Sequence, residues 1–430
     1  MSECVVVIEG CENMPPFEER YSPESIESLI EALSRVFDLL GGLDKFIKNG
    51  DRVLIKPNVV VPEPPWTGVN TDPRVLEALI ELIKGNNPKR IMVGEHVRWH
   101  GPRVFEVSGV GEAVHRAGGE IIIFDDMAHV PVDNTLAKVE PVLNVPEIYF
   151  ESDVLINVPK MKTHLDTLIS LSLKNIMGMV PSDPDCLAMH QHLYDSIVDL
   201  NRFFRPKLNI VDGIIAHEGQ GPMFGAPVTD MNVLVAGTDA VSVDAVSSSV
   251  MGIDPLEAPT TRLAVCHGLG KGDLSNISIK GRQINEVRRH FLRPMQNAVG
   301  YMRYDGVSYP VDLHLGIACG GCHGAIREQV DQLALLAEVE GVPEEKRKRL
   351  VVITGQNARV PCELPEDALV WVVGDCAAQH RDRGIFASGC PPAPTRELGP
   401  ECIGVPMSWP VLGRNDRLKS KCIGRARAQK

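Results

Sequence analysis

The sequence has no run of 18 apolar residues, the length that a membrane-spanning helix needs, so no transmembrane span is expected. Its first residues contain no basic region followed by a long apolar core, so a secretory signal peptide is not expected either. The chain is also poor in positive charge. With 44 Lys and Arg against 56 Asp and Glu, its net charge is -12, which argues against general nucleic-acid binding. A cytoplasmic location is therefore expected.

Two nucleotide-binding motifs are missing as well. No G-x-G-x-x-G opens a helix after the first predicted strand, and no G-K-[ST] follows a glycine-rich loop, so neither NAD nor ATP binding is indicated. The 11 cysteines are an odd number. In a cytoplasmic chain this favours metal ligation or reduced thiols over a disulfide framework.

Four cysteines in the last quarter of the chain are the most informative residues. Cys319 and Cys322 form a C-x-x-C pair, whereas Cys376 and Cys390 are single and each lies close after a glycine. Such thiolates bind an iron–sulfur cluster or a tetrahedral zinc ion. Structural zinc sites usually use two short pairs, so one pair with two distant cysteines favours the cluster. Zinc, and thiols without a metal, remain the alternatives.

The order C-x-x-C, G-x-C-A and G-C-P-P-x-P resembles the cluster-binding part of the small subunit of nickel–iron hydrogenases and the related subunit of respiratory complex I. This resemblance covers roughly residues 311–410 and rests on the four cysteines with Gly374, Ala377 and Gly389–Pro394. It implies one [4Fe-4S] cluster held by Cys319, Cys322, Cys376 and Cys390. It does not imply hydrogenase activity. An exposed cluster would also favour an anaerobic host.

The fold class expected for the chain is α/β, with a mostly parallel sheet in the N-terminal domain and a second, smaller α/β iron–sulfur domain. Short β-branched runs such as DRVLIKPNVVV and RIMVGEH alternate with helical patterns, which is typical of βαβ units. Residues 268–310 mix turns and charge and indicate a boundary. We therefore expect domains at 1–300 and 311–412, and a basic tail at 413–430 that is mobile or docks on an acidic surface.

Polar residues follow five of the predicted strands. Each of these ends alone is an ordinary turn, but five that meet at one edge of a parallel sheet predict a pocket. Ammonium groups there would hold a carboxylate or phosphate, and an imidazole or carboxylate would move protons. The structural alternative is a solvated lysine face and a histidine satisfied in its loop. The predicted catalytic residues are Lys162, His164 and Glu218. The predicted substrate-binding residues are Lys56, Asn58, Lys160, Lys174, Asn175, Gly221 and Asp239.

The segments VLIKPNVV, INVPKMKTH, SLKNIMGMVP, IVDGIIAHEGQGP and AGTDAVSVDAV resemble, in this order, the family known as domain of unknown function 362. The resemblance covers about residues 50–270. Members are often found with iron–sulfur modules, and many carry ferredoxin-type cysteine runs, whereas this chain carries the hydrogenase-type motif. The resemblance implies the fold and the pocket, but no reaction.

Three functions remain open. The first is an iron–sulfur oxidoreductase with one [4Fe-4S] cluster beside a pocket for an anionic organic substrate or cofactor. The second is an electron-relay or cofactor-maturation protein that binds a partner enzyme. The third is a redox-independent isomerase or lyase with a structural metal. The sequence predicts a small anionic molecule as ligand, and it leaves an electron-donor protein and a homo-oligomer open as partners.

Overall fold

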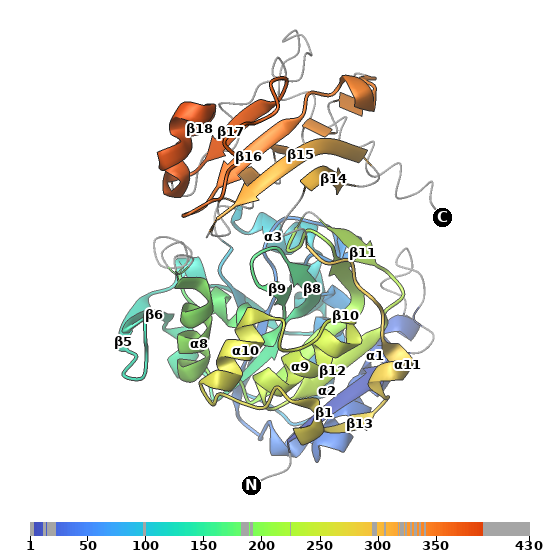
Figure 1. Ribbon diagram of the computed structural model, residues 1–430. Helices are drawn as coiled ribbons and strands as arrows, with labels where there is room; N and C mark the ends of the chain where they lie inside the picture. Colours follow the sequence, from blue (N-terminus) through green and yellow to red (C-terminus); the bar gives the residue numbers. More distant parts are fainter. Residues whose placement is uncertain are drawn as a thin grey trace. The chain divides into compact units, whose positions relative to one another are not determined.

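The computed structural model describes most of the chain up to residue 389 (Figure 1). The described residues are 4–11, 14, 23–97, 100–181, 189, 192–223, 225–294, 299–304, 307–316, 318, 322, 325–326, 329–330, 333–334, 337–338 and 341–389. The chain forms two compact units, Met1–Pro294 and Met295–Lys430. The predicted tail at 413–430 lies outside the described residues.

A sheet of 11 strands, counted over the described residues, forms the centre of the first unit. Its main path is β13 (Ser278–Gly281), β1 (Val5–Gly10), β12 (Val233–Gly237), β10 (Leu208–Glu218), β7 (Val154–Val158), β2 (Arg52–Pro57), β3 (Arg90–Glu95) and β4 (Glu120–Ile123). Neighbours along this path are parallel, except that β12 is antiparallel to both β1 and β10. The predicted fold class, α/β with a mostly parallel sheet, is thus confirmed.

Shorter strands extend this sheet beside β10. They are β8 (Lys160–His164), which follows β7 after one residue and pairs with β10, β9 (Leu168–Ser170) and β11 (Ala226–Val228). A separate hairpin consists of β5 (His129–Asp133) and β6 (Val142–Pro146). Because β8 prolongs the line of β7, β10 has a parallel partner far beyond the point where β7 ends.

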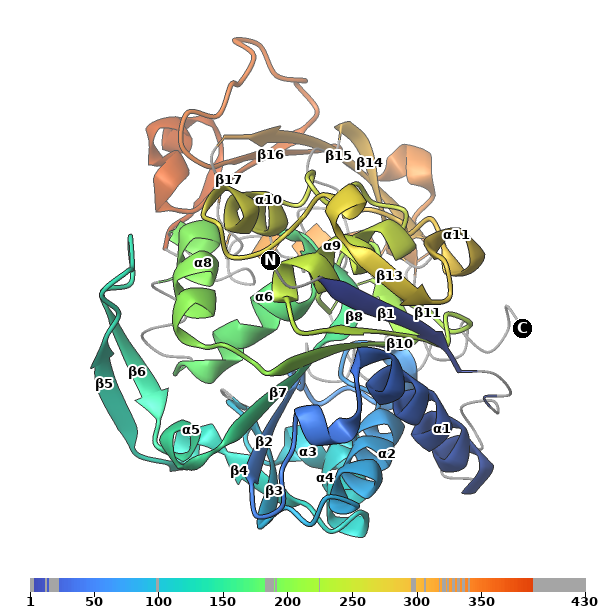
Figure 2. The same cartoon turned by 90° about the horizontal axis from the view of Figure 1, so that it is seen from below.

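Helices cover both faces of the sheet (Figure 2). One face carries α1 (Pro23–Leu40), α2 (Pro73–Lys84), α3 (Arg103–Val107) and α4 (Val110–Arg116). The other carries α6 (Ser172–Asn175), α8 (Leu193–Phe203), α9 (Ala240–Val250) and α10 (Pro259–Cys266). The described part of this unit also contains the short helices α5 (Ile148–Glu151), α11 (Ile284–Val287), η2 (Leu43–Lys45), η3 (Pro65–Thr67), η5 (Phe124–Asp126), η6 (Ile176–Met179) and η9 (Leu274–Asn276). None of the helices in the described part of the chain has an apolar stretch long enough to cross a membrane.

The central strands are apolar on both sides because helices cover both faces. Ile55 of β2 and Ile156 of β7 belong to the core under α1 and α2, whereas Leu54 and Leu155 belong to the core with α8 and α10. Successive side chains of a strand point to opposite faces. Lys56, two residues after Leu54, therefore enters the layer that contains α8, α9 and α10.

The second unit contains a five-stranded sheet in the order β14 (Val299–Tyr304), β15 (Val307–Leu315), β16 (Leu350–Thr354), β17 (Leu369–Val373) and β18 (Ile385–Ala387). β14 is antiparallel to β15, and the other neighbours are parallel. The described part of this unit also contains the short helices η10 (Glu344–Lys346) and η11 (Asp375–Arg383), and the described residues between 322 and 338 are helical. β14 and the first residues of β15 precede residue 311, the expected start of the second domain.

Candidate functional site

The strand ends that were expected to form a pocket do not all point the same way. β2, β3, β7 and β10 run parallel, so their carboxyl ends share a direction. β12 runs antiparallel to β10, and its end at Gly237 pairs with Asn209 at the amino end of β10. Asp239 follows β12, and its Oδ1 accepts hydrogen bonds from the N–H groups of Val241 (2.9 Å) and Ser242 (3.1 Å). Asp239 thus caps the start of α9, away from the other predicted binding residues.

Two of the predicted binding lysines form buried ion pairs. Lys56 Nζ lies 2.6 Å from Glu95 Oε2, and Lys160 Nζ lies 2.8 Å from Asp212 Oδ2. The side chains of these pairs are at most 5% exposed. Burial lowers the pKa of Lys56 and raises the pKa of Glu95, while each charge stabilises the other. A Cβ added at Gly178 would lie only 2.6 Å from Lys56 Nζ, so the backbone closes directly over this pair.

Lys162 is buried differently from these two lysines. Its Nζ donates to the carbonyl oxygen of Val69 (2.8 Å), and among the described residues no carboxylate forms an ion pair with it. Burial, together with the ammonium groups of Lys174 and Lys160, lowers the pKa of Lys162 to about 7. An amine with this pKa exchanges protons readily near neutral pH. Lys174 is half-buried, and its Nζ lies 3.5 Å from Met177 Sδ.

His164 and Glu218, the other predicted catalytic residues, are engaged by backbone groups. His164 ends β8, and its Nδ1 accepts a hydrogen bond from Asp166 N (3.1 Å). Glu218 ends β10, and its Oε2 accepts one from Leu292 N (2.8 Å). His164 Nδ1 and Glu218 Oε2 are thus already used as acceptors for backbone N–H groups.

The loop after β10 is packed against the backbone of β8. A Cβ at Gly221 would lie 1.9 Å from Thr163 O, so only glycine fits at this predicted binding position. Neighbouring His217 has both ring nitrogens occupied: Nδ1 bonds to Thr67 O (2.9 Å) and Nε2 accepts from Gly225 N (3.0 Å). Burial lowers the pKa of His217 to about 4, so it is a neutral histidine that holds the loop.

Asn58 and Asn175 belong to a buried chain of four asparagine side chains. Asn58 Nδ2 donates to Asn175 Oδ1 (3.0 Å), and Asn175 Nδ2 donates to Asn157 Oδ1 (2.8 Å). Asn157 Nδ2 donates in turn to Asn209 Oδ1 (2.9 Å). Neither Asn157, which follows a predicted strand, nor Asn209 was among the predicted binding residues. The available indication was an asparagine inside an otherwise apolar strand, as in VLINV and LNIV.

Sequence reasoning also missed a histidine pair beside Glu95. His96 Nε2 lies 3.0 Å from His129 Nε2, and His96 Nδ1 bonds to Gly178 O (3.0 Å). Burial lowers the pKa of His96 to about 4, so this ring is neutral near pH 7. The two imidazoles share one N–H···N hydrogen bond.

A cavity of about 530 Å³ lies on the α8, α9 and α10 face of the first unit, at a place that the sequence did not single out apart from Asp239. Its lining residues are Leu136, Leu173, Asn201, Arg202, Phe204, Arg205, Pro206, Asn209, Thr238, Asp239, Ala240, Val241, His267, Gly268 and Leu269.

The predicted cluster ligands belong to the second unit. The register aligns the last residues of four parallel strands in one row, Leu315, Thr354, Val373 and Ala387. The segments after β15, β17 and β18 contain the four predicted cysteines. Cys319 and Cys390 lie outside the described residues. Within the described part, no group of three or more His, Cys, Asp or Glu side chains is arranged to hold a metal ion.

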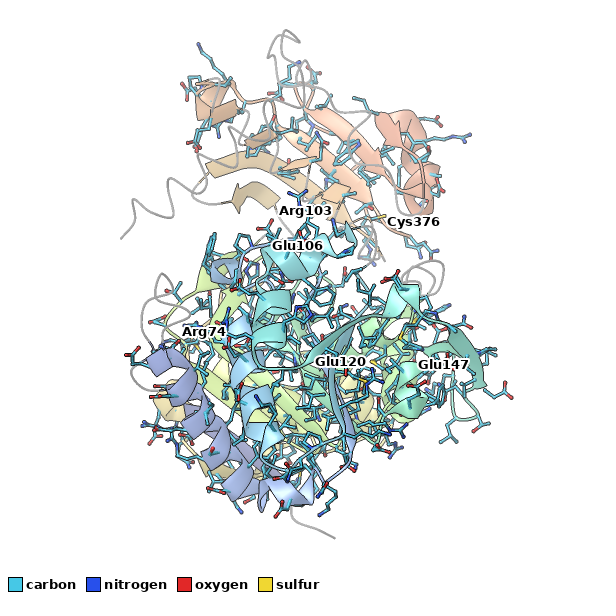
Figure 3. All side chains as sticks on the ribbon, turned by 180° about the vertical axis from the view of Figure 1, so that it is seen from behind. Arg74, Arg103, Glu106, Glu120, Glu147 and Cys376 are labelled. Carbon is cyan, nitrogen blue, oxygen red and sulfur yellow. The ribbon has the colours of Figure 1, made fainter. Side chains whose placement is uncertain are left out.

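Cys322 and Cys376, the two described cysteines of this set, approach the same glycine. A Cβ at Gly374 would lie 2.7 Å from Cys322 Sγ and 3.6 Å from Cys376 Sγ, so the two sulfur atoms are no farther apart than these distances combined. Figure 3 shows Cys376 at one end of the sheet of the second unit. The loops after β17 and β18 are joined, because Gly389 N donates to Asp375 Oδ1 (2.8 Å). The donor chemistry and the space at Gly374 fit a thiolate-bound metal or cluster.

Comparison with known proteins gives one family and few relatives. The family described as "Domain of unknown function (DUF362)" matches residues 53–249. The chain is similar to the thylakoid-associated protein sll1697 of Synechocystis sp., with 30% identity over 243 residues, 54% of this chain and 73% of the relative. It is also similar to a crystal structure of a Thermotoga maritima protein, with 12% identity and a TM-score of 0.30 over 85% of this chain and 92% of that one. So low a TM-score supports no argument.

We expect Lys160→Met to lower the free energy of unfolding by about 3–5 kcal/mol, because it leaves the buried Asp212 carboxylate without its ammonium partner. Urea unfolding of the full chain measures this change. Arg52→Met is the matched control, since it breaks an exposed ion pair with Asp153 that solvent screens, and it should change the free energy of unfolding far less. Similar losses in the two variants would contradict the structural role of the buried pair.

We expect the contribution of Lys162 to the free energy of unfolding to depend on pH, because burial disfavours its charged form. The pKa of Lys162 is about 7 in the folded protein and has an ordinary value of 10.5, so between these pH values the unfolded chain binds a proton that the folded chain does not. Stability therefore rises with pH in this window. The unfolding free energy of the wild type should rise relative to Lys162→Met by about 2 kcal/mol from pH 7 to pH 9.

Urea unfolding at several pH values measures this difference, and Lys207→Met, at an exposed lysine, is the control that should show no such trend. Parallel pH profiles for the wild type and Lys162→Met would contradict the low pKa of Lys162.

Proposed function

This chain belongs to the family of the domain of unknown function 362, and from this premise we propose that it is an iron–sulfur oxidoreductase that acts on an anionic organic substrate or cofactor. The family description assigns no reaction, so the proposal rests on the residues of the two units. The second unit would hold one [4Fe-4S] cluster, and the first would bind the anion and exchange protons with it.

The observation that carries the proposal is the position of the cysteine segments. They follow β15, β17 and β18, whose last residues lie in one row, and Cys322 and Cys376 converge on Gly374. A side chain larger than hydrogen at residue 374 would fill the space between these sulfur atoms. Cys319, Cys322, Cys376 and Cys390 would hold the cluster, which supplies one-electron transfer when bound.

Lys162 is the strongest candidate for proton exchange in the first unit. Its amine is buried and has a pKa of about 7, so it can take up or release a proton near neutral pH. Lys174 is half-buried, and its ammonium group contributes to the low pKa of Lys162. This ammonium group would attract a carboxylate or phosphate group. Reduction of a substrate would also need an outside electron source, which we propose to be an electron-donor protein.

Lys162 also supports a second candidate, the redox-independent isomerase or lyase. A buried amine with this pKa can move a proton between two positions of a substrate without any electron transfer. Turnover that survives in folded Cys376→Ala protein would favour this candidate.

Electron relay to a partner enzyme, a homo-oligomer and a cytoplasmic location stay predictions. The name of the Synechocystis relative describes that protein as thylakoid-associated.

We expect anaerobically purified protein to contain about four iron and four sulfide per chain, with an EPR signal after dithionite reduction. Cys376→Ala should lose the signal and most of the iron, because one of four ligands is removed. Cys362→Ala is the matched control in the same unit, since Cys362 is exposed and is not one of the four predicted ligands. About one zinc without sulfide would refute the redox proposal. Loss of iron in Cys362→Ala would show that the ligand set is wrong.

A further inference from the structure

Two histidines that play no part in the proposed proton exchange or cluster binding bring their ring nitrogens together. His96 directly follows β3, and His129 is the first residue of β5, in a hairpin outside the central sheet (Figure 2). His96 Nε2 lies 3.0 Å from His129 Nε2, and the planes of the two rings differ by 23°. Neutral imidazole nitrogens are ligands that zinc and other transition-metal ions prefer. A single proton therefore lies between two nitrogen atoms that are each able to bind a metal ion.

The bonds of His96 determine where its own proton lies. His96 Nδ1 is 3.0 Å from Gly178 O, and a carbonyl oxygen only accepts hydrogen bonds, so Nδ1 carries the proton. Burial lowers the pKa of His96 to about 4, so the ring is neutral near pH 7 and Nε2 has a lone pair. Histidines that bind metals typically donate their other ring N–H to a backbone carbonyl or a carboxylate, which fixes the ring. His96 is thus oriented as a ligand whose donor atom is Nε2.

Neighbouring residues hold the His96 ring in place. Phe124 packs edge-on against it, with ring centres 5.2 Å apart and planes at 71°. The backbone N–H of His96 donates to Glu95 Oε1 (3.1 Å). Asp125 accepts a hydrogen bond from Val97 N (2.7 Å), and its negative charge offsets part of the lowering of the His96 pKa by burial. A carboxylate that favours positive charge on this ring also favours a cation beside it.

His129 can become the second ligand by a change of tautomer. The shared proton belongs to His129 Nε2, because His96 Nε2 is the acceptor. A neutral imidazole carries its proton on either nitrogen, and His129 Nδ1 forms no hydrogen bond with any described residue. With the proton on Nδ1, His129 has its lone pair on Nε2. The side chain is half-buried, so solvent reaches part of it.

The pair needs little adjustment to hold a metal ion. Zn–N bonds are about 2.0–2.1 Å long, so the nitrogens of two imidazoles on a tetrahedral zinc ion lie about 3.3 Å apart. The observed 3.0 Å is close to this separation. Among the described strands, β5 pairs with β6 and not with the central sheet, so a small shift of His129 breaks no hydrogen bond of that sheet. No third His, Cys, Asp or Glu of the described residues completes the site, which leaves two positions for water.

We propose that His96 and His129 bind a divalent transition-metal ion of the zinc type through their Nε2 atoms. The ion takes the place of the shared proton, which moves to His129 Nδ1, and water fills the remaining positions. The ion joins the end of β3 to the start of the β5–β6 hairpin. This site goes beyond the proposed redox function, because both ligands belong to the first unit and none of the cluster cysteines takes part.

Isothermal titration calorimetry of the full chain with zinc chloride tests the proposal, after dialysis against a chelator to remove any zinc already bound. We expect His129→Gln to bind about one zinc ion fewer per chain than the wild type, because one of two ligands is removed. The glutamine amide can still donate a hydrogen bond to His96 Nε2, which favours retention of the fold. Thiols elsewhere in the chain are the same in both proteins, so the difference reports on this site alone.

His115→Gln is the matched control, because His115 is an exposed histidine in the last turn of α4 and receives the same substitution. It should bind zinc as the wild type does. His129→Gln should keep the iron and sulfide content of the wild type. Loss of this site and loss of the cluster are therefore separate results.

A second measurement needs no variant and decides the question if His129→Gln does not fold. In a crystal of the wild type soaked with zinc chloride, anomalous scattering at the zinc absorption edge should place an ion about 2.1 Å from both Nε2 atoms. Iron has a different absorption edge, so a cluster is not confused with this site. Equal zinc stoichiometry in the wild type and His129→Gln would overturn the proposal, as would an anomalous map with zinc only at other places.

Discussion

The pairing of buried charge in the first unit is the constraint on which the rest of that unit depends. Asp212 on β10 accepts hydrogen bonds from Lys160 Nζ on β8 and from Asp72 N at the start of α2. Glu95 on β3 likewise accepts hydrogen bonds from Lys56 Nζ on β2 and from Val59 N in the loop after β2. Each carboxylate therefore joins two strands and a loop or helix start. Because an unpaired buried charge is very unfavourable, these elements can pack only in the arrangement that satisfies both carboxylates.

The same arrangement explains why Lys162 differs from its neighbours. Glu95 and Asp212 already pair with Lys56 and Lys160. Lys162 is therefore buried with the Val69 carbonyl oxygen as its hydrogen-bond acceptor and with like charges around it. Its amine loses much of its proton affinity as a result. The lysines of this cluster therefore have different roles. Lys56 and Lys160 pair with carboxylates and stabilise the fold, whereas Lys162 has no carboxylate partner among the described residues and keeps an amine of low pKa.

The sequence was sufficient for features that depend on local rules. Helix α2, Pro73–Lys84, follows such rules, since Asp72 caps its start and Gly85 follows its end. The reversal of β12 could not be predicted, because a strand sequence does not record the direction of its neighbour. For the same reason Asp239 was expected beside Lys56. Asn157 and Asn209 were missed because their hydrogen bond depends on the register between β7 and β10. That cysteines follow strands could be read from the sequence, whereas the convergence of Cys322 and Cys376 at Gly374 required coordinates.

The position of β1 in the sheet has a consequence for how the chain is made. β1 leaves the ribosome well before β12 and β13, but it lies between these two strands in the sheet, and Val6 pairs with Gly237. Its edges must therefore stay unpaired while nearly the whole first unit is synthesised. Pairings between residues so distant in sequence form slowly, and an apolar strand that waits for its partners is exposed to association with other chains. We therefore infer that the N-terminal segment is the part of this unit most in need of protection by chaperones during synthesis.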